Sequence, residues 1–287
     1  MKICIALATA VLAMTGCLRT ASAALILSDN FDGYADQAAF QVAWPAIGTV
    51  APTSAELSIA QSSSAPQSIR VPGTLTNSQS RNRRSFAESG SVDTTHRVNW
   101  SFDFYDGAPT ANPARNYSNL QDTIAPGSTN QLVAMGFNNN QVATNSGGQF
   151  YMARILGYTV PTTPDPDGGP TETVGGAGAF FKLNDFGAGA RTLGWHNLKV
   201  ILSTDNGLST DYAFYVDNVL AEIVSNIGTA ASIRSYDNIV LGSGLSNAST
   251  EAFFDNVRLE YVPEPSTIAL TGVFLGLAAC ASRRRAA

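Results

Sequence analysis

The residues of this chain that could carry catalytic chemistry are few and do not form a recognised catalytic motif. The 287 residues include two histidines, His96 and His196, and neither lies in a motif typical of acid–base or nucleophilic catalysis. A Ser-His-Asp arrangement is formally possible, whereas two histidines are too few for a His-rich transition-metal site. We interpret His196 as a partly exposed strand residue that follows Trp195.

Carboxyl pairs are a second source of chemistry, because two of them can hydrolyse a glycosidic bond. Such pairs lie about 5–10 Å apart across a sugar cleft, and retaining enzymes often carry alternating acids on one strand. No E-x-D-x-E run occurs here. Glu251 and Asp255 could share a strand face, but Ala252, Phe253 and Phe254 between them look like packing residues. We therefore predict that the protein is not an enzyme, and the alternative is a secreted polysaccharide-active enzyme.

Acidic and amide side chains crowd two turns, where their oxygens could bind calcium. Asp29, Asn30 and Asp32 lie near the first predicted strand, and Asp255 lies near the last. If these strands pair, the three carboxylates could converge on one ion, which takes roughly six to eight oxygen ligands. Asn and Asp side chains equally bind their own backbone in turns. Calcium is thus a candidate cofactor beside ordinary turn chemistry, and we expect no other cofactor.

Aromatic side chains on a sheet face or loop could bind a carbohydrate. Packing in the core is the other interpretation, and it applies above all to the tryptophans Trp44, Trp100 and Trp195. The candidates for sugar binding are Tyr105, Tyr117, Tyr151, Tyr158 and Trp44.

The charges separate the body of the chain from its two ends. The chain has 17 basic and 22 acidic residues, and residues 24–260 hold 12 of the basic and 21 of the acidic ones. The resulting net charge of −9 argues against a nucleic-acid partner, which requires a basic stripe. All three cysteines, Cys4, Cys17 and Cys280, lie in the ends, so the body has no disulfide and no thiolate zinc site.

The N-terminus has the three parts of a secretory signal peptide. A positively charged start precedes the apolar run Ile3–Met14, and small residues follow up to Ala23. This pattern predicts a signal helix over residues 1–23, cleaved between Ala23 and Ala24. The segment Met14–Cys17 also resembles a lipobox, so acylation at Cys17 is an open alternative.

The C-terminus, residues 261–287, forms a second processing segment. As a helix, its apolar run of 15 residues would span about 22 Å, which is less than a typical membrane core of about 30 Å. The basic cluster that follows would stay on the cytoplasmic side, so the body would face outwards. The parts of this tail, in order, are Pro263, Glu264 and Pro265, the apolar run Thr267–Ala281, and Arg283, Arg284 and Arg285.

These three parts, in this order at the chain end, resemble the PEP-CTERM sorting signal of Gram-negative bacteria over residues 262–287. The resemblance implies recognition by an exosortase in the inner membrane, cleavage near the motif, and delivery to the cell surface or an extracellular polysaccharide matrix. The alternative is an ordinary C-terminal membrane anchor. The expected partners are therefore signal peptidase, exosortase, the membrane through the C-terminal helix, and an extracellular polysaccharide as ligand.

The body between the ends, residues 24–260, has the pattern of a β domain. Apolar residues alternate with polar ones from Val98 to Phe104, from Leu198 to Leu202 and from Val257 to Tyr261, which is the period of a strand with one apolar face. Clusters of Gly, Asn, Asp, Ser and Pro separate the runs, and no long amphipathic helix occurs. The irregular stretch 157–178 predicts a long exposed loop. This organisation is typical of an all-β sandwich or jelly roll.

Two further segments resemble the paired strands of laminin-G-like and concanavalin-A-like jelly rolls. They are Gly194–Val200 and Tyr212–Asn218, and the segments Leu27–Tyr34 and Phe253–Leu259 fit the first and last strands, which often pair in one sheet. The resemblance implies a jelly-roll sandwich. Together with the two processing segments, it predicts an exported surface or matrix protein that is non-enzymatic and either binds glycans or has a structural role in exopolysaccharide.

Overall fold

A computed structural model describes the body of the chain and leaves both processing helices outside the described residues. Outside them lie residues 1–21 of the predicted signal segment with Cys17, the long loop with Tyr158, and Pro265 and the arginine cluster of the tail. None of the helices in the described part is long and apolar enough to cross a membrane. The described residues are 22–47, 55–73, 81–109, 115–123, 131–138, 150–156, 179–226, 235–242 and 250–264.

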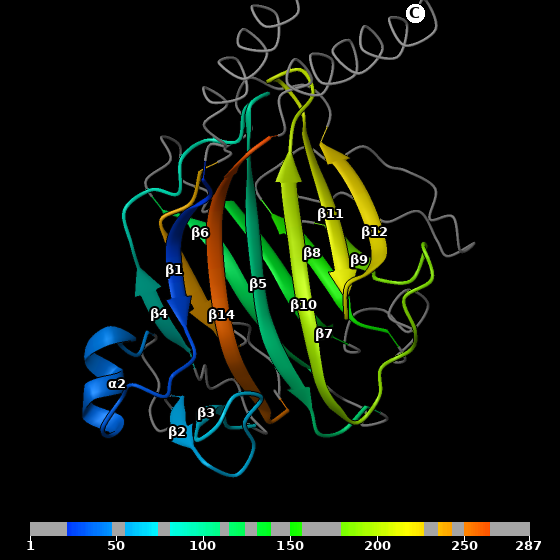
Figure 1. Ribbon diagram of the computed structural model, residues 1–287. Coiled ribbons are helices and arrows are strands. Elements are labelled where there is room, and N and C mark those ends of the chain that lie inside the picture. Colours follow the sequence, from blue (N-terminus) through cyan, green and yellow to red (C-terminus); the bar gives the residue numbers. More distant parts are fainter. Residues whose placement is uncertain are drawn as a thin grey trace, which may run out of the picture.

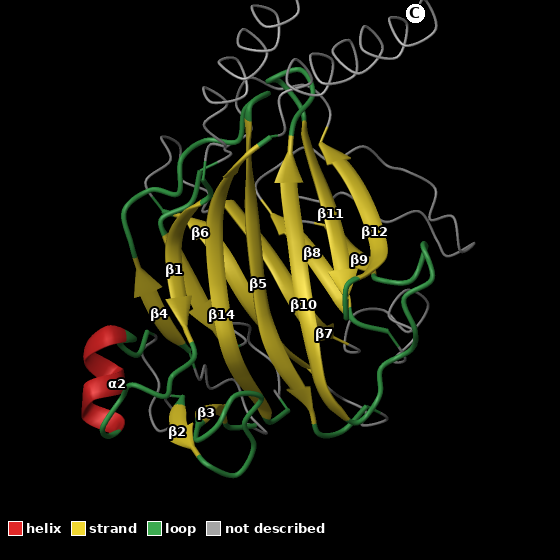
Figure 2. Ribbon diagram, viewed as in Figure 1, coloured by secondary structure: helices red, strands yellow, loops and turns green. Residues whose placement is uncertain are grey.

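The fold consists of two antiparallel sheets that pack face to face, with one sheet in front of the other in Figures 1 and 2. The eight-stranded sheet, called sheet A, has the spatial order β12 (Val219–Asn226), β11 (Thr210–Val216), β10 (Gly194–Ser203), β5 (His96–Asp106), β14 (Ala252–Pro263), β3 (Ser68–Val71) and β2 (Glu56–Ser58). Its eighth strand, β1 (Ala24–Asp29), also pairs with β14. The six-stranded sheet, called sheet B, has the order β4 (Asn82–Ser85), β13 (Asn238–Leu241), β6 (Arg115–Asp122), β7 (Gln131–Asn138), β8 (Met152–Leu156) and β9 (Ala179–Lys182). The predicted all-β sandwich is confirmed.

The core lies between the two sheets and is rich in aromatic rings. Strand β5 buries every second residue, as its alternating sequence predicts. Phe104 of this strand contacts Phe254 of β14 at 5.2 Å and Phe137 of β7 at 5.3 Å between ring centroids. Edge-to-face contacts of this kind join the two sheets and add to the free energy of apolar burial.

The first and last strands pair, as the resemblance to jelly rolls implies. Ala24 lies opposite Tyr261, and β14 continues between β1 and β5 as far as Pro263, which lies opposite His96. One short helix, α2 (Gln37–Ala43), follows β1 and was not foreseen in the sequence. The side chain of Asp36 accepts a hydrogen bond from the backbone N–H of Ala39 and caps this helix.

Candidate functional site

Sheet B has two faces of different chemistry. Leu120, Val133 and Ile155 point into the core between the sheets, and their strand neighbours point to the opposite, outer face. Tyr117 and Ala134 form a separate apolar cluster on that outer face, together with Leu132. Strand β6, which lies near the middle of the sheet, supplies the outward series Arg115, Tyr117, Asn119 and Gln121.

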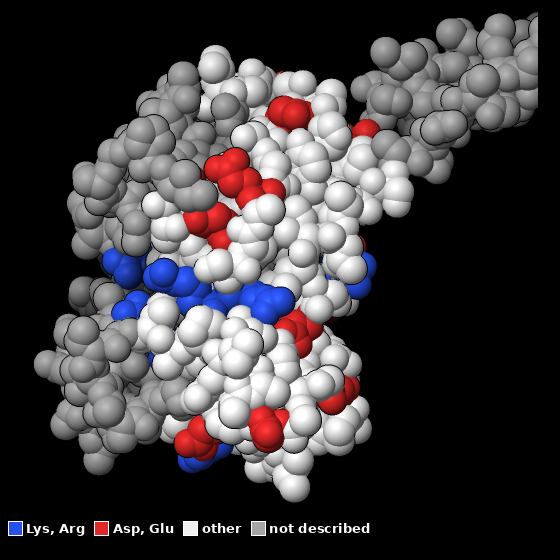
Figure 3. Space-filling model, turned by 90° about the vertical axis from the view of Figure 1, so that its left-hand side faces the viewer, with Lys and Arg blue, Asp and Glu red and all other residues white. Residues whose placement is uncertain are grey.

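Basic side chains gather on this outer face although the body as a whole is acidic. None of the outward positions on the described strands of sheet B holds an acidic residue. Figure 3 shows Lys and Arg side chains in a continuous band across the side of the molecule where β4 lies. The basic residues of the face are Arg83 on β4, Arg115 on β6, Arg154 on β8 and Lys182 on β9, with Arg81 directly before β4.

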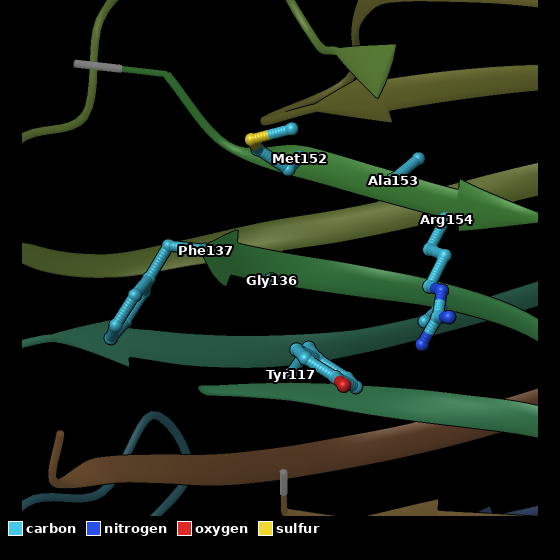
Figure 4. A pocket seen from close by; sticks show the side chains of 7 residues that line it. Tyr117, Gly136, Phe137, Met152, Ala153 and Arg154 are labelled. Atoms are coloured by element: carbon cyan, nitrogen blue, oxygen red, sulfur yellow. The ribbon is translucent and has the colours of Figure 1, made fainter. Parts of the chain in front are cut away.

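Tyr117 lies at the centre of this basic face. Its side chain is buried, with 5% of the residue exposed, and the guanidinium carbon of Arg115 lies 6.0 Å from its ring centroid. Arg154 approaches from β8, and the two side chains point toward each other in Figure 4 and form a hydrogen bond. A phenol is thereby held between two guanidinium groups, one of which donates to its oxygen.

A small cavity adjoins the phenol ring. Its volume is about 10 Å³, about the size of one water molecule. Figure 4 shows the residues that line it, which come from three neighbouring strands. They are Tyr117 from β6, Ala134, Gly136 and Phe137 from β7, and Met152, Ala153 and Arg154 from β8.

Gly136 permits the close packing beside Tyr117. The two residues are paired across β6 and β7, and Gly136 has φ of 155°. A Cβ atom at this position would lie 2.3 Å from the carbonyl oxygen of Asn116 and 2.5 Å from the Cα of Tyr117. Only glycine fits here without a shift of β6, so the position of the phenol depends on this residue.

Burial of the arginines makes the face receptive to an anion. Burial lowers the pKa of Arg154, and the nearby charge of Arg115 lowers it further, while the Tyr117 hydroxyl partly opposes this change. Arg115 is 2% exposed, and within the described part of the chain its Nε atom has no hydrogen-bond partner. A buried cation without a carboxylate partner is costly, and a bound anion would relieve that cost.

The predicted calcium residues do not lie in this face, and their oxygens bind protein donors. One oxygen of Asp29 accepts hydrogen bonds from Tyr34 and Trp44 at 2.6 and 2.8 Å. Asp255 accepts hydrogen bonds from the backbone N–H groups of Ser63 and Ser64, and Asp32 accepts one from Asn30. Among the residues that the structure describes, no group of three or more His, Cys, Asp or Glu side chains could hold a metal ion.

The acids considered for glycosidic hydrolysis belong to sheet A, on the other side of the sandwich. Glu251 forms an ion pair with Arg70 at 2.5 Å, and Asp255 is the acceptor for the backbone described above. Burial raises the pKa of Asp255, although backbone hydrogen bonds from Ser64, Asn256 and Ser63 oppose the shift. Neither residue faces the basic surface of sheet B.

His196 has the partners of a hydrolytic triad but not its proton arrangement. Its Nδ1 lies 2.8 Å from Asp217, and its Nε2 lies 3.1 Å from the hydroxyl of Thr192. The same Nε2 lies 3.0 Å from the Thr192 carbonyl oxygen, which can only accept a hydrogen bond. A hydrogen bond to that carbonyl would require a proton on Nε2, and a nitrogen that carries a proton cannot take one from a nucleophile. His96 stacks on Tyr261 at 4.5 Å, at the end of β14.

The aromatic candidates separate into core and surface residues. Trp44, Trp100 and Tyr151 are at most 1% exposed and belong to the core. Tyr105 and Trp195 are partly exposed on the outer face of sheet A, with ring centroids 5.5 Å apart. Of the four described residues among these sugar-binding candidates, Tyr117 is the one that lies in the basic face of sheet B.

The sorting motif begins at the edge of the described domain. Pro263 is the last residue of β14, and the Glu264 N–H donates to the carbonyl of Thr95 at 2.6 Å. The Glu264 carboxylate lies 3.8 Å from a guanidinium nitrogen of Arg97. At the other end, the predicted mature N-terminus, Ala24, is the first residue of β1.

The sequence predicts Tyr117 as a sugar contact but does not predict the basic residues around it. Two sequence signals could have found the basic face. One is the dense cluster Arg81, Arg83 and Arg84, and the other is the alternation in β6 that puts Arg115 and Tyr117 on one side. The register of sheet B then brings these two segments, which are distant in sequence, onto a common surface.

Comparisons with known proteins find similarity at the level of the fold. No protein-family model and no curated protein sequence matches the chain. A carbohydrate esterase from the Shiga toxin-encoding bacteriophage phi24B superposes with a TM-score of 0.53 and 13% identity, covering 84% of this chain and 100% of that one. The alginate lyase Aly36B superposes with a TM-score of 0.49 and 10% identity, covering 82% of this chain and 96% of that one. An endo-β-1,4-glucuronan lyase from the fungus Trichoderma reesei superposes with a TM-score of 0.47 and 12% identity, covering 83% of this chain and 95% of that one.

At these identities the similarity to the esterase shows a shared fold, a β-sandwich of the jelly-roll kind. It also corrects the functional prediction. The expectation of a non-enzymatic binding or structural protein is contradicted, because the solved structure that superposes with a TM-score of 0.53 is a carbohydrate esterase. The alternative, a polysaccharide-active enzyme of jelly-roll fold, agrees better with these comparisons. The polar face of sheet B contains arginines and a tyrosine, and its described strands place no carboxylate there.

Proposed function

We propose that this protein is a secreted polysaccharide-active enzyme that cleaves an acidic glycan by β-elimination, with Tyr117 as the group that transfers the proton. The observation that carries the proposal is the phenol of Tyr117, held between Arg115 and Arg154 on a face whose described strands place no carboxylate outward. The finer assignment of the sandwich to the laminin-G-like or concanavalin-A-like jelly rolls is part of the same proposal.

The chemistry follows from the residue types. Hydrolysis of a glycosidic bond by the common route requires two carboxyl groups, which this face does not supply. In a uronate, the C5 hydrogen is adjacent to a carboxylate, and a guanidinium that neutralises this carboxylate makes the hydrogen removable as a proton. Arg115 is suited to receive the carboxylate, because it is buried and its Nε has no partner among the described residues.

The proposed step balances without a cofactor. The Tyr117 phenolate, stabilised by the hydrogen bond from Arg154, takes the C5 proton. The electron pair of the C5–H bond forms a C4=C5 double bond, and the bond between C4 and the glycosidic oxygen breaks. The departing oxygen receives a proton from the phenol, which returns Tyr117 to its starting state. Proton transfer by a positioned side chain typically contributes about 10²–10⁴-fold to the rate.

A direct assay tests this proposal. The purified protein is incubated with alginate, polygalacturonate and glucuronan, and the unsaturated product is followed by the ultraviolet absorbance of its conjugated double bond. We expect activity on at least one of them and none on a glycan whose carboxyl groups have been reduced. Release of a new reducing end without the double bond would show hydrolysis and contradict elimination.

We further propose that the chain is exported and sorted through its two ends. In support, the cleavage site predicted between Ala23 and Ala24 directly precedes strand β1, and the Pro-Glu-Pro motif directly follows the body of β14. Signal peptidase and an exosortase would be the partners, and the cell surface or the extracellular matrix the destination. Intact mass of the protein from its host tests this proposal. A mature chain that begins at Ala24 and ends near the motif is expected, whereas a lipid-modified Cys17 or an intact tail would contradict it.

A further inference from the structure

A second group of polar side chains lies beside Tyr117, toward the β4 edge of the basic face. Arg83 on β4 lies opposite Val240 on β13, and Val240 lies opposite Asn119 on β6, so the three side chains form one row on the outer face. With strands about 4.8 Å apart, the Cα atoms of Arg83 and Asn119 are about 10 Å apart. Tyr117 is two residues from Asn119 on the same strand.

Electrostatic coupling connects this row with Tyr117. Burial lowers the pKa of Arg81, the neighbouring charge of Arg83 lowers it further, and Tyr117 is close enough to oppose the change. Arg81 precedes Arg83 by two residues, so the charges of both lie toward the β4 side of Tyr117. The band of basic side chains in Figure 3 follows this edge.

Two polar atoms in the row lack partners within the described residues. Asn119 is 3% exposed, and its side-chain oxygen accepts no hydrogen bond. The Nε atom of Arg83 is also buried and donates to no acceptor. Buried polar groups are hydrogen-bonded in the great majority of cases, so an acceptor and a donor left open on one face indicate a ligand with both functions.

We infer that Arg81, Arg83 and Asn119 form a second subsite, which binds an anionic sugar next to the one that reacts at Tyr117. This inference rests on the proposed function for the position of the reacting sugar. The guanidinium groups would receive a carboxylate or sulfate, and the Asn119 oxygen would accept a sugar hydroxyl. The Cα atom of Arg83 lies about 12 Å from that of Tyr117, so its guanidinium would contact a neighbouring sugar of the polymer, and the glycan crosses the strands toward β4.

The test compares oligomer length and charge. The substitution Arg83→Gln removes the charge and keeps most of the stem, and Arg81→Gln is a second variant of the same kind. Arg258→Gln is the matched control, since Arg258 is an exposed arginine on the opposite sheet, paired with Glu260 at 2.6 Å. Binding of alginate and polygalacturonate disaccharides and tetrasaccharides is measured by calorimetry, with a neutral tetrasaccharide and a sulfated one as probes of charge. Thermal unfolding of each variant checks the fold.

We expect both variants to lose about 10-fold or more in affinity for the acidic tetrasaccharides, because a hydrogen-bonded charge is lost. Affinity for the disaccharides, which reach only the first subsite, should change little, and Arg258→Gln should bind like the parent. Tighter binding of the sulfated probe than of the uronates would identify sulfate as the anion.

The outcomes separate the subsite from the proposed reaction. Equal loss for short and long oligomers, or no loss in either variant, would overturn the subsite even if the parent protein cleaves the polymer. Failure of the parent to bind any anionic oligomer more tightly than the neutral one would also overturn it. If binding depends on Arg83 but no uronate is cleaved, the subsite stands and elimination at Tyr117 does not.

Discussion

Replacement of Gly136 by alanine should disturb the fold and the site together. The new Cβ atom would lie 2.3 Å from the Asn116 carbonyl oxygen, whereas carbon–oxygen contacts between strands are about 3.3–3.6 Å. Strands β6 and β7 would therefore have to separate by about 1 Å at this pair. The obstructing atoms belong to backbone, so no side-chain rotation can relieve the clash.

The expected cost follows from two terms. Overpacking of a well-packed interior costs typically about 1–3 kcal/mol, and an alanine forced into a backbone conformation that it rarely adopts adds about 1 kcal/mol or more. We therefore expect Gly136→Ala to lower the free energy of unfolding by about 2–4 kcal/mol. Because Tyr117 lies opposite Gly136, the phenol should also shift relative to Arg154, and turnover should fall more than the loss of stability alone explains.

Equilibrium unfolding in denaturant measures the effect, with Gly189→Ala as the matched control. Gly189 has open space where a Cβ atom would be placed, so that variant should stay within about 0.5 kcal/mol of the parent. A Gly136→Ala protein as stable as the parent, or as stable as Gly189→Ala, would refute the argument from close approach.

Two further predictions concern charged groups outside the basic face. Asp106 and Arg191 form an ion pair at 2.7 Å, and both side chains are 1% exposed. Arg191→Met should therefore lower the free energy of unfolding, measured in urea, by about 3–5 kcal/mol. The double variant Arg191→Met with Asp106→Asn should lose less than the sum of the two single losses, and simple additivity would contradict the pairing. Burial tends to raise the pKa of Asp93, but hydrogen bonds from Thr95 and the charge of His96 hold it at about 2, below its ordinary 3.8. The stability that this lowered pKa contributes is present above about pH 4 and is lost as the pH falls toward 2. In Asp93→Asn the free energy of unfolding should therefore depend less on pH between about 4 and 2. The same pH dependence in the variant and the parent would contradict this role of Asp93.

The fold was largely accessible from the sequence, because apolar alternation is a local property. Strand β5 follows that pattern, and the pairing of β1 with β14 agrees with the resemblance of their sequences to terminal strands. Strand β6 was not foreseen, since its eight residues, Arg115–Asp122, include six polar or charged ones and yet all are buried. Its environment depends on partners in β7 and β13, which no local pattern reveals.

The candidate site was less accessible than the fold for a similar reason. Net charge is an average over the chain, and a body with a net charge of −9 gave no reason to expect a polyanion partner. Antiparallel pairing concentrates Arg83, Arg115 and Arg154 on one face of sheet B, where the described strands place no acid. The expectation of a non-enzymatic protein depended on composition and on the absence of a carboxylate motif, and neither detects a tyrosine between arginines.

Replacement of Tyr117 by phenylalanine tests the central claim most directly. Tyr117→Phe keeps the ring beside the cavity and removes only the hydroxyl that bonds to Arg154. Elimination activity on the best polyuronate should fall by about 10²–10⁴-fold, while binding of its tetrasaccharide and the free energy of unfolding change little. A Tyr117→Phe protein that forms the unsaturated product at the parent rate would contradict the account.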